Sequence, residues 1–253
     1  MTSDMTVTDY LAQGGRLTNP ANVPTRYRAE IMKIMARFVD SELAGAAGFA
    51  DVINEGPGIK ERIAAARIVL EKTDSADRVL RLMGEFGANT DRYATHHPWT
   101  DRLPRDTPPG TQRSAHDMRL SVLNYPLDGW TDAVVMNLLM GLAVGVQLTE
   151  FLRCSYQPFA DAIRAIAPVE RRHTELALEG VQKLITAGDT DRINHSVAYW
   201  WPRVSESFGV DATSRAEALN AMGLRKLSNA ELHTQWVAQA SETLSDAGLK
   251  PPA

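Results

Sequence analysis

Residues 159–184 read FADAIRAIAPVERRHTELALEGVQKL, a stretch whose apolar residues recur every three or four positions. This spacing is typical of one buried face of a long helix. The face carries Glu170 and His173 near its middle, so both side chains project from the same side. Glu-x-x-His at this spacing binds metal ions inside helical bundles, and it predicts a core helix with a polar centre. The stripe comprises Phe159, Ile163, Ile166, Glu170, His173, Ala177, Gly180 and Leu184.

A second long helix is predicted over residues 24–54, and it carries one carboxylate within its apolar face. Glu42 lies in the middle of this face. A lone carboxylate in a core is costly unless it is paired, protonated or bound to a metal. An edge position or a salt bridge would also explain Glu42. The stripe comprises Ile31, Met35, Phe38, Glu42, Gly45, Phe49 and Val52.

The helix predicted over residues 59–86 decides whether a metal site is complete. Its apolar row, which faces inward, contains Lys72 with Ser75 beside it. An ammonium and a hydroxyl are poor ligands for iron at neutral pH. The opposite, charged row predicts a solvated face. The inward row is Lys72, Ala76, Val79, Met83 and Phe86, and the charged row is Glu71, Asp74, Arg78, Arg81 and Glu85.

The remaining pattern predicts an all-α protein. An almost wholly apolar helix is expected over residues 130–154, with Gly141 and Gly145 at its middle and Glu150 more than two turns away from Gly141. Two long helices, a long crossover and two more long helices predict a ferritin-like four-helix bundle core with additional C-terminal helices. We expect an N-terminal arm over residues 1–23 and a single ferritin-like helical domain over residues 24–253. The crossover spans residues 88–127, the fourth long helix 158–187, and the additional helices 190–207, 213–224 and 229–247.

Composition excludes several classes of function. The chain has 253 residues, a net charge of -4 and a single cysteine, Cys154. One cysteine rules out an intrachain disulfide framework and a cysteine-based zinc site. The negative charge argues against nucleic-acid and anionic-membrane binding. The most apolar stretch, residues 133–148, is too short to span a bilayer, and the N-terminus has no signal-peptide pattern. We therefore expect a cytoplasmic protein with no membrane or nucleic-acid partner.

Several short segments carry a family resemblance. The distinctive ones are Asn-Tyr-Pro at 124–126 and Tyr-Trp-Trp-Pro at 199–202, supported by Arg-Cys-Ser-Tyr-Gln-Pro-Phe at 153–159 and Leu-Ser-Asn-Ala-Glu-Leu at 227–232. With them, residues 24–250 resemble the phenylacetic acid catabolic protein family, and in particular its phenylacetyl-CoA epoxidase catalytic subunits. The resemblance implies a ferritin-like fold and, in intact members, an oxygen-activating di-iron site that acts on an aromatic acyl-CoA.

The departures from this family are specific. Its metal-ligand positions match here at Glu42, Glu170 and His173, whereas its second-helix Glu and His fall on Lys72 and Ser75. Its third-helix acid falls on Gly141. Two irons in a carboxylate-rich site need about four carboxylates and two imidazoles, more than these positions supply. The family also contains partner subunits that lack the metal ligands.

Two hypotheses follow for function. In the favoured one, the chain is a non-catalytic, structural or binding member without a cofactor, and the Lys72 ammonium between Glu42 and Glu170 replaces the metal charge. In the alternative, Glu42, Glu170 and His173 hold iron or manganese in a mono- or di-metal oxygenase for an aromatic acyl-CoA; a full di-iron site would need Glu71 and Asp74 turned inward. We expect a homodimer or a hetero-oligomer with a related ferritin-like subunit, and an acyl-CoA is the ligand that the resemblance implies.

Overall fold

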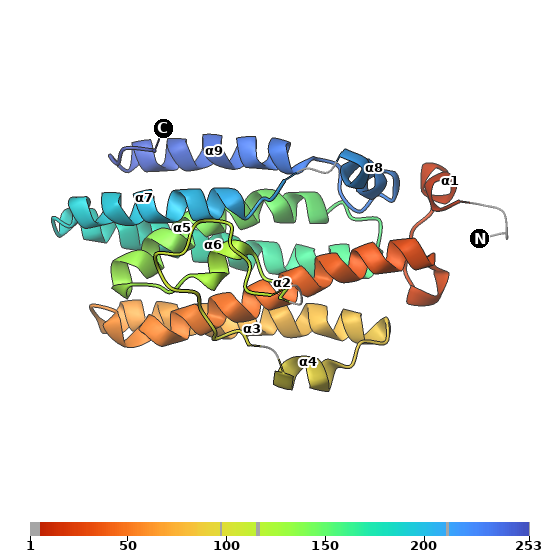
Figure 1. Cartoon of the computed structure of the whole chain (residues 1–253), viewed down its shortest axis with the longest axis horizontal. Helices are drawn as coiled ribbons and strands as arrows, with labels where there is room; N and C mark the ends of the chain where they lie inside the picture. The colour runs from red at the N-terminus through yellow and green to blue at the C-terminus, as the bar shows by residue number, and fades with distance from the viewer. Residues whose placement is uncertain (1–5, 97, 115–116, 211–212, 253) are drawn as a thin grey trace.

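Four long helices form the body of the protein (Figure 1). The computed structural model describes residues 6–96, 98–114, 117–210 and 213–252. Within these residues the structure is helical, and its only β-type pairing is an isolated bridge between Leu17 and Tyr156. The long helices are α2 (Thr25–Val52), α3 (Ile59–Glu85), α5 (Gly129–Phe151) and α6 (Gln157–Thr186). The predicted all-α, ferritin-like bundle is confirmed.

The four helices pack as two hairpins. Helices α2 and α3 are joined by the short 3-10 helix η2 (Ile53–Glu55), and α5 and α6 are joined by a tight turn. Contacts between α3 and α6 and between α2 and α5 close the bundle. The apolar stripes of α2 and α6 point inward, since Ile31, Met35, Phe159 and Ile163 are fully buried. The polar residues within these stripes are thereby carried into the bundle.

Helix α5 is the most apolar element of the fold. Among the described residues it is the one helix long and apolar enough to cross a membrane, with a mean hydropathy of 1.6, and 61% of that window is buried. With 23 residues, α5 is longer than the apolar stretch 133–148, which by itself is too short to span a bilayer. Helices α7 (Thr190–Glu206) and α9 (Asn229–Asp246) pack against it from the side away from α2. Its position at the centre of the bundle accounts for its apolar composition.

The C-terminal helices are held by polar contacts as well as by packing. Ser228 and Glu231 form a capping box at the start of α9. The Trp236 indole, fully buried, donates a hydrogen bond of 3.0 Å to the Leu139 carbonyl of α5. The buried Glu150 carboxylate accepts the backbone N–H groups of Lys226 and Leu227 at 2.7 Å each. Helix α8 (Thr213–Ala221) precedes this junction and lies across the end of α5 near α2 (Figure 1).

The arm and the crossover contain short helices that the sequence analysis did not predict. These are α1 (Val7–Ala12), η1 (Pro20–Asn22), α4 (Thr90–His96) and η3 (Ser121–Asn124). Leu17 of the arm is buried, and its backbone pairs with Ser155 and Gln157. In the crossover, the buried Arg119 guanidinium donates to the carbonyls of Pro98, Trp99 and Asp101. These bonds lie within the crossover; the Leu120 N–H and the Arg102 guanidinium join it to α2, donating to the Ser41 hydroxyl and the Ala44 carbonyl at 3.0 Å each.

Candidate functional site

Four of the predicted site residues meet in the middle of the bundle. The Lys72 ammonium of α3 lies 2.8 Å from Glu170 Oε2 of α6, and 3.3 Å and 3.4 Å from the two carboxylate oxygens of Glu42 of α2. His173 lies one turn along α6, with Nδ1 at 3.3 Å from Glu170 Oε1. All four residues are at most 8% exposed. Ser75 is also buried, but among the described residues it makes no hydrogen bond to them.

The charged groups of this cluster shift the pKa values of their neighbours. Burial raises the pKa of Glu42, and the negative charge of Glu170 raises it further, against the opposing effect of Lys72. Burial alone would raise the pKa of Glu170 as well, but Lys72 and His173 outweigh burial and hold it well below its usual range. The two carboxylates raise the pKa of Lys72 although burial opposes this. The closest ion pair is therefore the Lys72 ammonium and the Glu170 carboxylate, while the pKa of Glu42 is raised by burial and by Glu170.

Glu71 also belongs to the cluster, and its predicted place on a solvated face is wrong. Its Oε2 lies 2.7 Å from His173 Nε2, and its side chain is only one third exposed. Both ring nitrogens of His173 thus face a carboxylate. Buried histidines commonly need a partner on the second ring nitrogen, and this requirement, which the sequence analysis did not use, could have pointed to a further acid. The rest of the charged row, Asp74, Arg78, Arg81 and Glu85, is exposed as predicted.

Helix α5 contributes no carboxylate to the cluster because α6 packs closely against it. A Cβ atom at Gly141 would lie 2.3 Å from the Thr174 hydroxyl oxygen and 3.1 Å from the Thr174 Cβ. Thr174 in turn donates its hydroxyl to the Glu170 carbonyl, and Asn137 donates to the His173 carbonyl. The space for a larger residue at position 141 is therefore occupied by the helix that carries Glu170.

The donor atoms present do not fit a pair of iron ions. Two oxygen-bridged irons in a helical bundle are held by about four carboxylates and two imidazoles. Within the described part of the chain, no group of three or more His, Cys, Asp or Glu residues is arranged to hold a metal ion. The Lys72 ammonium lies between Glu42 and Glu170, and a cation there would be repelled at short range. Within this cluster, two buried atoms, Glu170 Oε1 and His173 Nδ1, make no hydrogen bond to the described residues.

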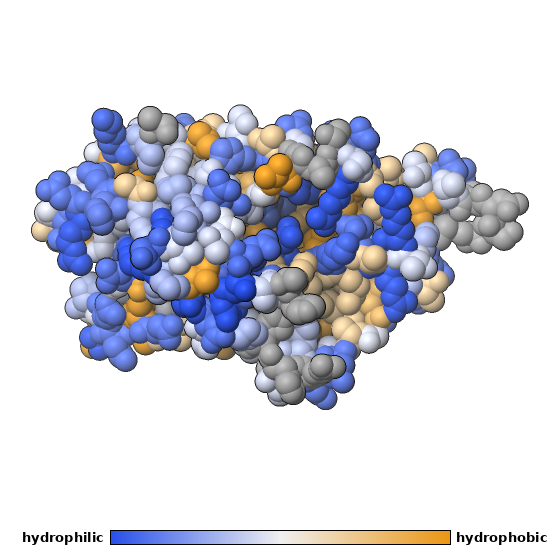
Figure 2. Space-filling view, viewed as in Figure 1, coloured by the Kyte–Doolittle hydropathy of each residue, from blue (hydrophilic) through white to orange (hydrophobic). Residues whose placement is uncertain are grey.

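Two cavities meet at Glu42. The inner one, of about 50 Å³, lies beside Lys72 and Glu170 and is lined mainly by apolar residues such as Met136 and Met140. The outer one, of about 180 Å³, lies between α2, α5 and α8. In the space-filling view, hydrophobic side chains are visible at the bottom of a hollow between α2 and α8, with hydrophilic side chains at its rim (Figure 2). The residues that line both cavities are Ser41, Glu42, Leu120 and Val144.

The raised pKa of Glu42 predicts how stability depends on pH. The folded state holds the Glu42 proton more tightly than the unfolded chain, so this contribution is complete below about pH 4.5 and is lost as the pH rises through neutrality. We expect Glu42→Gln to remove it, so that the free energy of unfolding falls less between pH 5 and pH 8 than in the unmodified protein. We expect this fall to differ between the two proteins by about 1 kcal/mol or more, because a tenfold change in proton affinity is worth about 1.4 kcal/mol. Urea unfolding at both pH values measures it, and equal pH dependence in the two proteins would contradict it.

Comparisons with known proteins agree with this architecture. Residues 5–253 match a family described as phenylacetic acid catabolic protein. Among solved structures, the chain is similar to protein 19 with aldehyde deformylating oxidase activity from Synechococcus, with 15% sequence identity and a TM-score of 0.61. The similarity covers 90% of this chain and 93% of that one, and it concerns the fold alone. Comparison with curated protein sequences finds no match.

Proposed function

The chain belongs to the phenylacetic acid catabolic protein family, and within it we propose that this protein is a non-catalytic, ligand-binding member. Lys72 supplies the positive charge that metal ions supply in the metal-binding members. The observation that carries the proposal is the position of Lys72 Nζ, 2.8 Å from Glu170 and 3.3 Å from the nearer oxygen of Glu42. Glu42 and Glu170 match positions at which the family's metal ligands are expected. The ammonium therefore occupies the position between them that a metal ion would take.

The cavities support a binding role. An apolar inner cavity and a wider outer cavity lead from the surface to Glu42 and Lys72, so a small molecule has room next to the buried cluster. Ligand sites are typically concave, mainly apolar and supplied with a few well-placed polar groups. Binding of this kind requires no metal.

A second candidate function rests on two atoms. Glu170 Oε1 and His173 Nδ1 are buried, lie 3.3 Å apart and carry no hydrogen bond. One carboxylate oxygen and one imidazole nitrogen are ligands that iron and manganese accept. With Glu42 as a third ligand, they would make a metal-dependent oxygenase for an aromatic acyl-CoA or a related substrate. This candidate function requires the Lys72 ammonium to move out of the space between Glu42 and Glu170.

Partners and location are also proposals. We infer a homodimer or a hetero-oligomer with a related ferritin-like subunit, and what supports it is an exposed apolar stripe on α3. The stripe comprises Ile59, Ile63 and Leu70. Contiguous exposed apolar side chains often mark protein contacts. A cytoplasmic location fits the lone, buried Cys154 thiol.

Restoring the family's ligands on α3 tests the proposal. We expect the double variant Lys72→Glu and Ser75→His to gain iron after anaerobic reconstitution with Fe(II), because two ligand types return where the ammonium stood. Its melting temperature should rise with Fe(II), as binding to the folded state stabilises it. The matched control, Lys183→Glu with Thr186→His, introduces the same two residue types at the same spacing on the exposed face of α6. The proposal fails if the unmodified chain takes up as much iron as the double variant.

A further inference from the structure

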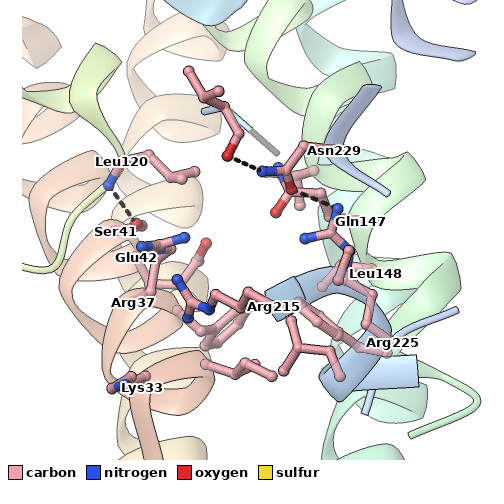
Figure 3. A pocket seen from close by; sticks show the side chains of 17 residues that line it. Lys33, Arg37, Ser41, Glu42, Leu120, Gln147, Leu148, Arg215, Arg225 and Asn229 are labelled. Atoms are coloured by element: carbon pink, nitrogen blue, oxygen red, sulfur yellow. Dashed lines mark hydrogen bonds between the residues drawn. The ribbon is translucent and has the colours of Figure 1, made fainter. Parts of the chain in front are cut away.

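The outer cavity has a strongly cationic mouth. Four positively charged side chains line it, and α2, α8 and the segment before α9 contribute them (Figure 3). In the part of the chain that the structure describes, the acids near these cations are Glu42, at the inner end, and Glu30, outside the lining. The cations are Lys33, Arg37, Arg215 and Arg225.

Three of these cations already have partners. Glu30 pairs with both Lys33, at 2.9 Å, and Arg215, at 3.1 Å. Arg225 donates to the Leu227 carbonyl at 2.8 Å and to the Asn229 side chain. One carboxylate thus pairs with two of the cations, and two of the acceptors of Arg225 are neutral. Among the described residues that line the mouth, positive charges outnumber negative ones.

Arg37 is the exception. Among the described residues it makes no hydrogen bond or ion pair, and the Arg215 side chain of α8 extends toward it (Figure 3). Arg37 is exposed at the mouth, yet partial desolvation lowers its pKa, and the positive charge of Arg215 lowers it further. Two guanidinium groups held together without a shared anion are unfavourable, and an oxyanion between them would remove the repulsion and accept several N–H bonds.

The walls beyond the mouth are apolar. Phe38 of α2 and Val144, Leu148 and Phe151 of α5 form the sides of the cavity, which ends at Glu42. Arg37 and Glu42 are five residues apart on one helix, so the distance between their backbone positions along the axis is about 7.5 Å. A short hydrocarbon or aromatic body fits between the mouth and Glu42, and the inner cavity extends this space.

We propose that the outer cavity binds an amphiphile with one oxyanion head, a carboxylate or a phosphate, which lies between Arg37 and Arg215 while its apolar body lies along α2 and α5 toward Glu42. This inference rests on the proposed binding role and names the ligand class. Recognition of the head is bidentate at Arg37, the one cation of the mouth without a partner among the described residues. The apolar body contributes through burial against Phe38 and Phe151.

Binding of three eight-carbon probes to the full chain tests this proposal by calorimetry. We expect octanoate or octyl phosphate to bind at least 10-fold more tightly than octanol, which has the same tail and no charge. The two anions distinguish a carboxylate head from a phosphate head. Equal affinity for octanol would overturn the proposal, and so would tight binding of octanoyl-CoA with no binding of either simple anion.

Variants at the mouth complete the test. Arg37→Gln should weaken binding of the preferred anion at least 10-fold and leave octanol unaffected, whereas the exposed control Arg172→Gln should change neither. Because Arg37 makes no hydrogen bond or ion pair to the described residues and lies near the like charge of Arg215, Arg37→Gln should leave the melting temperature unchanged or raise it. Arg215→Gln should weaken anion binding too. The proposal would be overturned if Arg172→Gln weakened anion binding as much as Arg37→Gln does, or if Arg37→Gln did not weaken it. Iron content measured on the same samples reports separately on the role of Lys72.

Discussion

Replacing Lys72 by methionine should destabilise the protein by about 3–5 kcal/mol, the range for breaking a buried ion pair. Methionine keeps the length of the side chain, so the loss reports on charge more than on an empty cavity. Without the ammonium, Glu170 loses its 2.8 Å partner and faces Glu42 across a water-poor space. Urea unfolding monitored by circular dichroism gives the free energy.

Two controls isolate the effect at Lys72. Lys183→Met removes an exposed lysine that pairs with Glu61, and such surface pairs are worth about 1 kcal/mol or less. Adding Glu170→Gln to Lys72→Met should recover part of the stability, since it removes the uncompensated carboxylate. A loss below about 1 kcal/mol for Lys72→Met would contradict the idea that its ammonium neutralises the cluster.

Replacing Gly141 by glutamate, the residue type of the family's third-helix acid, should cost about 3 kcal/mol or more. The new Cβ would meet Thr174 at 2.3 Å, and the new carboxylate would join Glu42 and Glu170 in the bundle. Overpacking costs about 1–3 kcal/mol, and an unpaired buried charge adds to it.

Gly145 provides a matched control for this substitution. It lies one turn further along α5, is exposed, and has nothing within 4 Å of a new Cβ. Gly145→Glu should therefore be neutral or stabilise the helix by up to about 1 kcal/mol. Equal unfolding free energies for the two variants would show that position 141 is open to an acid.

The apolar stripes predicted the buried centre well, because a helix period alone decides which face turns inward. Glu42 and Glu170 interrupt otherwise apolar faces, and Lys72 stands in the inward row of its helix, so their convergence followed once four long helices were inferred. The all-α, ferritin-like architecture was predicted for the same reason.

The features that escaped prediction depend on how helices pack on one another. Glu71 lies beside the inward row of α3, and only the approach of α6 brings it to His173. Arg37 and Arg215 are far apart in the sequence, and they meet because α8 lies across the end of α5 near α2. Similarly, helix α4 lies within the crossover, where no long periodic pattern marks it.

The iron content of the unmodified chain tests the central claim most directly. The protein would be reconstituted anaerobically with Fe(II), freed of loosely bound metal and analysed for iron per chain. An ammonium held between Glu42 and Glu170 predicts less than about 0.2 equivalents, because it repels a cation at that position. One or two equivalents that are lost in His173→Ala would contradict the account and favour a metal-dependent oxygenase.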